Sequence, residues 1–82
     1  MPLPNRSAAM EIAPRIVVDP SIQSGKPVIR GTRIPVDLIV GQIAGGMSAE
    51  QVGTEYDLEI EDVRAALAYA AQILSQETVR AV

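Results

Sequence analysis

The sequence feature that most constrains the fold is the decapeptide that runs from residue 26 to residue 35, KPVIRGTRIP. Two short β-favouring pairs, Val28-Ile29 and Arg33-Ile34, flank a Gly31-Thr32 corner, which predicts a small hairpin. Proline fixes φ near about −65° and has no amide hydrogen to lose, so Pro35 suits the first turn of a helix. The decapeptide therefore joins an extended half of the chain to a helical half.

The length and composition predict one small domain that needs a partner. A chain of 82 residues buries only roughly 60 to 65 per cent of the surface that it exposes when unfolded. It has no cysteine and no histidine, so we expect neither a disulfide nor a thiolate or imidazole metal site. Self-association or binding to another protein is then the remaining source of stability.

The composition also narrows the functional class. The chain has no signal-peptide pattern and no apolar run near the roughly 20 residues that span a bilayer, which predicts a cytoplasmic protein without a membrane segment. It is 48% hydrophobic but only 2% aromatic, and this favours short packed helices over an aromatic-rich barrel. The net charge of −3 argues against a protein that coats nucleic acid without specificity.

The N-terminal part predicts a flexible leader and a short strand. Residues 1–11 contain prolines and no apolar period, as a mobile leader does. The β-branched run of residues 16–18 is stopped by Asp19-Pro20 and predicts a strand. This strand has two possible neighbours, an arm of the hairpin or the matching strand of a second copy, and an isolated ribbon with an open edge favours the second copy. The predicted dimer interface consists of Ile16, Val17, Val18, Val28 and Ile29.

Two helices follow the decapeptide. An amphipathic stripe at positions 36, 39, 40, 43 and 44 predicts a first helix that ends at Gly45-Gly46. Gly41 weakens its middle by about 1 kcal/mol relative to alanine, and a glycine there often permits close approach of another element. Ser48 and Gln51 have the spacing of a capping box, which predicts a short second helix from residue 49 to about residue 56.

The last helix is predicted to begin near Ile60. An apolar seam runs along positions 60, 63, 67, 70 and 74, and alanines on its flanks suit close packing on a second subunit. Residues 76–82 form a tail with apolar Val79 and Val82 and no stop signal. We therefore expect residues 12–75 to form a single domain, with residues 1–11 and 76–82 outside it.

The three helices have the spacing of a helix-turn-helix, although a three-helix core without a nucleic-acid role gives the same pattern. A recognition helix should present basic or amide side chains at its start, but Glu61 and Asp62 lie there and Arg64 is the one strong donor. The basic residues of the decapeptide are better candidates for phosphate contact. Alternatively they form a solvated edge, or Arg30 and Arg33 pair with Asp37 or Asp19. The predicted DNA-binding residues are Lys26, Arg30, Arg33 and Arg64.

The residues do not support catalysis. Gly25-Lys26 lacks the upstream glycine and the following Ser or Thr of a phosphate-binding loop, and Pro27 removes an amide donor. The carboxylates lie at helix ends without a clustered base, nucleophile or ligand set. The sequence therefore predicts a protein that is not an enzyme and that needs no cofactor.

Several segments resemble the bacterial family known as domain of unknown function 433, over about residues 16–70. They are IVVDP at 16–20, GKPVIRGTRIPV at 25–36, GMSAEQV at 46–52, Tyr56, Leu58, EDV at 61–63 and AALAY at 65–69. The chain departs from the family pattern at Ser24, where glycine is usual, and at Asp57, where proline is usual. Glu59 replaces the usual threonine cap of the last helix, which predicts a frayed helix start.

The resemblance implies a mainly α fold, a three-helix homeodomain-like helix-turn-helix with a short N-terminal β-hairpin or swapped strand. Many members look like antitoxins of type II toxin-antitoxin pairs that neutralise a PIN-like ribonuclease toxin and repress their own promoter. We therefore expect a homodimeric antitoxin that binds operator DNA and docks its C-terminal segment in the toxin. The alternative is an interaction or dimerisation module that does not bind DNA. The predicted toxin-binding residues are Ile73, Leu74, Val79 and Val82.

Overall fold

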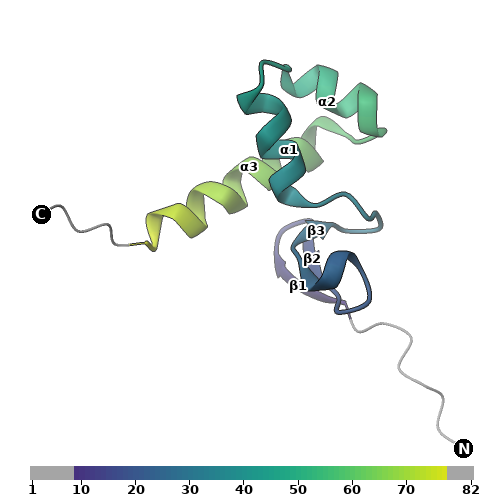
Figure 1. Cartoon of the computed structure of the whole chain (residues 1–82), viewed down its shortest axis with the longest axis vertical. Helices are drawn as coiled ribbons and strands as arrows, with labels where there is room; N and C mark the ends of the chain where they lie inside the picture. The colour runs from purple at the N-terminus through teal and green to yellow at the C-terminus, as the bar shows by residue number, and fades with distance from the viewer. Residues whose placement is uncertain (1–8, 78–82) are drawn as a thin grey trace, which may run out of the picture.

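The computed structural model describes residues 9–77, which form a small antiparallel sheet followed by three helices (Figure 1). The predicted mainly α, helix-turn-helix fold is confirmed. Figure 1 shows the sheet at the end of α1 where the helix begins, and the C-terminal half of α3 projects beyond the other helices. The elements are β1 (Met10–Ala13), β2 (Ile16–Val18), the short 3-10 turn η1 (Gln23–Gly25), β3 (Val28–Ile29), α1 (Val36–Ala44), α2 (Ala49–Tyr56) and α3 (Ile60–Ser75).

The sheet has the order β1-β2-β3, so β2 is its central strand. β2 pairs antiparallel with β1 on one side and with β3 on the other. The predicted leader therefore ends earlier than expected, because Met10 and Glu11 belong to β1. With both edges of β2 occupied by its own chain, the strand is not left open for a second copy. Of the two neighbours that the sequence left open for this strand, the structure shows the Val28 arm of the same chain and not a strand of a second copy.

The corner of the decapeptide forms as predicted, but its second arm is not a strand. Gly31 has a φ of 80°, a left-handed conformation that glycine adopts without steric cost. The Ile29 N–H donates to the Ile34 carbonyl at 3.0 Å, and the Thr32 hydroxyl donates to the Ile29 carbonyl at 2.8 Å. The two arms thus meet through a tight turn, while β3 pairs with β2.

The helix ends follow the local signals of the sequence. Gly46 ends α1 with a φ of 114°, and its N–H donates to the Ile43 carbonyl at 3.0 Å, as in a left-handed C-terminal cap. The capping box of α2 is complete. The Ser48 N–H donates to Gln51 Oε1 at 2.7 Å and the Gln51 N–H donates to Ser48 Oγ at 3.0 Å.

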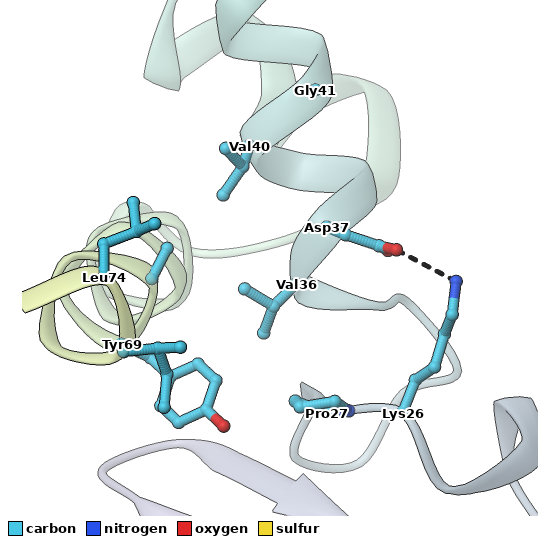
Figure 2. Close-up of a pocket in the computed structure, with 10 residues that line it drawn as sticks. Lys26, Pro27, Val36, Asp37, Val40, Gly41, Tyr69 and Leu74 are labelled. Atoms are coloured by element: carbon cyan, nitrogen blue, oxygen red, sulfur yellow. Dashed lines mark hydrogen bonds and ion pairs between the residues drawn. The ribbon is translucent and has the colours of Figure 1, made fainter. Parts of the chain in front are cut away.

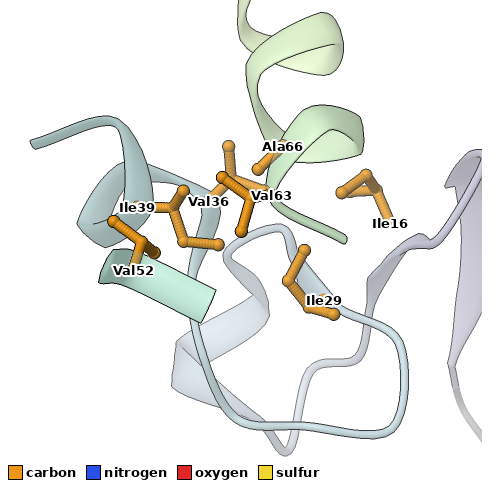
Figure 3. Packing of buried hydrophobic residues seen from close by; sticks show 7 residues of the cluster. All are labelled: Ile16, Ile29, Val36, Ile39, Val52, Val63 and Ala66. Carbon is orange, nitrogen blue, oxygen red and sulfur yellow. The ribbon is translucent and has the colours of Figure 1, made fainter. Parts of the chain in front are cut away.

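An aliphatic core joins the sheet to all three helices (Figure 3). Of the five residues predicted to form the dimer interface, all but the half-buried Val18 are at most 6% exposed within the single chain. These four side chains are buried inside one chain, so their surfaces are not available for the predicted dimer interface through the strands. The core consists of Ile16, Ile29, Val36, Ile39, Val52, Val63 and Ala66.

Arg15 fastens the β1–β2 turn to the start of α3. Its Nη1 lies 2.8 Å from Asp62 Oδ1 and 3.2 Å from Glu59 Oε1. The hydrogen bond to Asp62, followed by the one to Glu59, raises the pKa of Arg15 above its usual value. The second oxygen of Asp62 accepts from the Glu59 N–H at 3.0 Å. The start of α3 is therefore held in place, and the predicted fraying at Glu59 is wrong.

Replacing Arg15 should loosen this attachment. We expect Arg15→Gln to lower Tm by a few degrees in low salt and by less in high salt, because ion pairs near the surface are screened. Amide hydrogen exchange should become faster in the first turn of α3. Lys26→Gln, which breaks an ion pair that does not involve the first turn of α3, is the matched control and should leave that exchange unchanged. Equal exchange in Arg15→Gln and the parent chain would contradict the role of Arg15.

Asp19 is buried in the turn that follows β2, at 8% exposure. Its Oδ1 accepts a hydrogen bond from the Ser21 hydroxyl at 2.7 Å and one from the Ser21 N–H at 2.9 Å. These bonds favour the ionised carboxylate, and the one from the hydroxyl contributes most to lowering the pKa of Asp19. The predicted ion pair between Asp19 and an arginine is thus replaced by a local turn.

The lowered pKa makes the contribution of Asp19 to stability depend on pH. This contribution is fully present above a pH of about 3.9, the pKa of an aspartate in an unfolded chain. It is lost as the pH falls through the lowered pKa that Asp19 has in the folded protein. Asp19→Asn should therefore lower Tm at neutral pH, and the difference from the parent chain should shrink in acid. Thermal unfolding across this pH range tests the prediction. A difference that does not change with pH would contradict it.

Candidate functional site

An apolar groove of about 470 Å³ lies between α1 and the C-terminal half of α3 (Figure 2). Val36 and Val40 of α1 form one wall, and Gly41 lies at its edge. Pro27 closes the groove near the sheet. Such a concave apolar surface is the usual form of a site that receives the apolar side chains of a partner.

The other wall of the groove belongs to α3. It includes Tyr69, Ala70 and the predicted toxin-binding residues Ile73 and Leu74. Ile73 is 38% exposed and Leu74 is 63% exposed. The structure thus brings these two residues together with the stripe of α1, whereas Val79 and Val82 lie outside the described residues.

Residues 71–77 are exposed, and the sequence from residue 65 to residue 76 contains no charged residue. A helix face that meets only water normally carries charged side chains. The middle of a protein–protein interface, by contrast, is depleted of them. The exposed half of α3 therefore has the composition of a docking surface.

Two of the four predicted DNA-binding side chains are engaged in ion pairs. Lys26 Nζ lies 2.9 Å from Asp37 Oδ2, at the rim of the groove (Figure 2). Arg30 Nη1 lies 2.7 Å from Glu11 Oε1 of β1. Asp37 was one of the two predicted partners of Arg30 and Arg33, but it pairs with Lys26 instead. Both ion pairs lie near the surface, so they reduce the local positive charge without adding much stability.

The other two predicted DNA-binding residues, Arg33 and Arg64, are exposed. Among residues 9–77, neither forms an ion pair. The Arg33 carbonyl accepts a hydrogen bond from Gln23 Nε2 at 3.0 Å. Arg64 lies on α3, whose first turn carries Glu61 and Asp62. Of the four predicted DNA-binding residues, these two are the ones whose charge is not compensated by an ion pair within residues 9–77.

Sequence reasoning missed Arg15 and Tyr69. Arg15 lies in a turn that the sequence did not predict, because β1 was not predicted. The acidic residues that it contacts, Glu59 and Asp62, are more than 40 residues away in the sequence. Tyr69 is not one of the seam positions predicted for the last helix, but in the structure its side chain lines the groove (Figure 2). The available signal was that Tyr69 is one of only two aromatic residues in the sequence.

No group of three or more His, Cys, Asp or Glu side chains within residues 9–77 is arranged to hold a metal ion. None of the helices α1 to α3 has both the length and the apolar character needed to cross a bilayer.

Comparison with known proteins gives matches to this same domain. The model of the family described as "Protein of unknown function (DUF433)" matches residues 16–70. The uncharacterized protein y4eO of Sinorhizobium fredii is 38% identical over 69 residues, which is 83% of this chain and 30% of that protein. An uncharacterized protein of Archaeoglobus fulgidus is 70% identical over 23 residues, 28% of this chain and 64% of that protein.

Two solved structures resemble the fold. A DUF433 member protein from Anabaena variabilis has a TM-score of 0.69 and 33% identity, covering 76% of this chain and 62% of that one. Rv2018 from Mycobacterium tuberculosis has a TM-score of 0.59 and 29% identity, covering 63% of this chain and 24% of that one. The chain thus spans less than two thirds of the length of each of these relatives. The family match, which includes the decapeptide and α3 up to residue 70, shows that the chain belongs to the DUF433 family.

Proposed function

We propose that this chain is a cytoplasmic antitoxin that binds and masks a PIN-like ribonuclease toxin. The observation that supports the proposal best is the exposed, uncharged half of α3, which presents Ile73 and Leu74 beside an apolar groove. In this mechanism the chain acts by occupancy, because its apolar face covers the toxin. It catalyses no reaction and needs no cofactor.

The geometry suits a partner that inserts a helix. The groove is open along α1 and α3, and its walls are aliphatic apart from the Tyr69 ring. An amphipathic helix laid in such a groove buries its apolar side chains and keeps its polar face in water. The Lys26–Asp37 pair at the rim leaves no net charge there to repel the partner.

Toxin binding provides the first test. We expect Leu74→Lys to weaken binding to the proposed PIN-like ribonuclease toxin by about tenfold or more, because an ammonium group would be buried in an apolar contact. Gln72→Lys is the matched control, since Gln72 is also exposed on α3 but does not line the groove. Calorimetry gives the affinity and RNA cleavage gives the neutralisation. Unchanged affinity and full neutralisation by Leu74→Lys would refute the docking site.

We further propose that the antitoxin binds its own promoter DNA as a dimer, with Arg33 and Arg64 contacting phosphates. The helix-turn-helix arrangement of α2 and α3 supports this part of the proposal. The alternative is an interaction or dimerisation module without DNA binding. It is favoured by the ion pairs of Lys26 and Arg30 and by the acidic start of α3.

A salt titration on a promoter fragment separates the two functions. If the chain binds DNA, affinity should fall steeply with salt, and Arg33→Ala and Arg64→Ala should each reduce the slope of log K against log salt by about 1. Lys26→Ala should change the slope less, because Asp37 already compensates this charge. Absence of preferential binding to the promoter over unrelated DNA at low salt would leave the interaction module as the function.

A further inference from the structure

The groove and the side chains beside it are complementary to each other. Val36 and Val40 form a concave apolar wall, while Leu74, 63% exposed, stands out from the opposite wall. Both features lie on one face of the molecule. A surface that contains both the protruding group and the hollow that receives it can pair with a copy of itself around a two-fold axis.

Gly41 marks where another chain can approach. It lies in the middle of α1, where glycine is unfavourable, and it is exposed at the edge of the groove. A Cβ built on Gly41 would meet no atom within 4 Å. No element of the described chain therefore uses the close approach that this glycine permits. Together with Ala70 on the facing wall, Gly41 leaves room for the side chains of a helix from outside.

The charges of α3 favour an antiparallel arrangement of two copies. Its acidic residues lie in the first turn, and residues 65–76 are uncharged. If two α3 helices cross near Ala70, the acidic start of each lies about 15 Å from the crossing, at 1.5 Å per residue. The two acidic starts are then at opposite ends of the interface. The α3 segments that meet are uncharged, and the Lys26–Asp37 pair at the rim of the groove carries no net charge, although each chain has a net charge of −3.

We propose that, without another protein partner, the groove is occupied by α3 of a second copy of this chain. The two α3 helices lie antiparallel, and Leu74 of each copy enters the groove of the other beside Gly41. This dimer uses α1 and α3, whereas residues 16–18 and 28–29 remain inside each chain. Because each copy contributes only one helix and one groove, we expect a weaker contact than a standard interface of roughly 800 Å² per partner, with dissociation in the low-micromolar range.

This dimer has a consequence for the proposed function. If the toxin docks in the same groove, it must displace the second copy, so neutralisation and this dimer exclude each other at a given groove. The consequence depends on the proposed antitoxin role. The dimer itself does not, because it is measured on the isolated chain.

Sedimentation equilibrium of the full chain over a range of concentrations tests the proposal. The parent chain and Gln72→Lys should be dimers at about 100 µM, well above a low-micromolar Kd. Leu74→Lys and Gly41→Lys should be monomers at this concentration. Because the side chain at residue 41 enters open space and lysine favours helix more than glycine does, Gly41→Lys should keep its circular dichroism spectrum and should not lower the melting temperature of the monomer.

Two results would overturn the proposal. One is a parent chain that is monomeric at about 100 µM, where a low-micromolar dimer must form. The other is a folded Gly41→Lys variant that dimerises as tightly as the parent chain. Neither result bears on the toxin, since no toxin is present. Loss of toxin binding in Leu74→Lys with an unaltered monomer–dimer equilibrium would support the proposed function and refute this dimer.

Discussion

The packing of β2 against α3 is the contact on which the rest of the structure depends. Ile16 is fully buried and belongs to the same cluster as Val63 and Ala66 of α3. β2 is only three residues long, and it is held in place by hydrogen-bonded strands on both sides. Arg15 adds a polar attachment at the turn that leads into β2. The sheet therefore holds the first half of α3 against α1 and α2, which determines where the second half projects.

The helices were predictable from sequence because their ends depend on local chemistry. Ser48, Gln51 and Gly46 each make the backbone contacts that their positions indicated. β1 was not predictable, because its four residues are too short a run to indicate a strand and become one only by pairing with β2. This omission also explains the prediction of a dimer through the strands. Without β1, one edge of β2 is open and a second copy is the natural way to cover it.

The candidate site was predictable only in part. Ile73 and Leu74 attracted attention because the apolar pattern of the last helix continues without a stop signal. Val36 and Val40 belong to one apolar stripe in the sequence, yet Val36 is buried whereas Val40 is half-buried in the wall of the groove. The difference depends on where α3 crosses α1, which no local pattern contains. The acidic partners of Lys26 and Arg30 were also not predicted, because the fold determines which carboxylates lie next to them.

The two halves of α3 have different environments, and alanine suits both. In the first half, Ala66 lets α3 approach the sheet and the other helices closely, and it is fully buried. In the second half few contacts stabilise the helix, so it depends more on intrinsic propensity, which is highest for alanine. Ala70 and Ala71 therefore help to keep Ile73 and Leu74 on a formed helix before any partner arrives. A preformed face loses less conformational entropy on binding than a face that must fold first, so even a small apolar groove can contribute useful affinity.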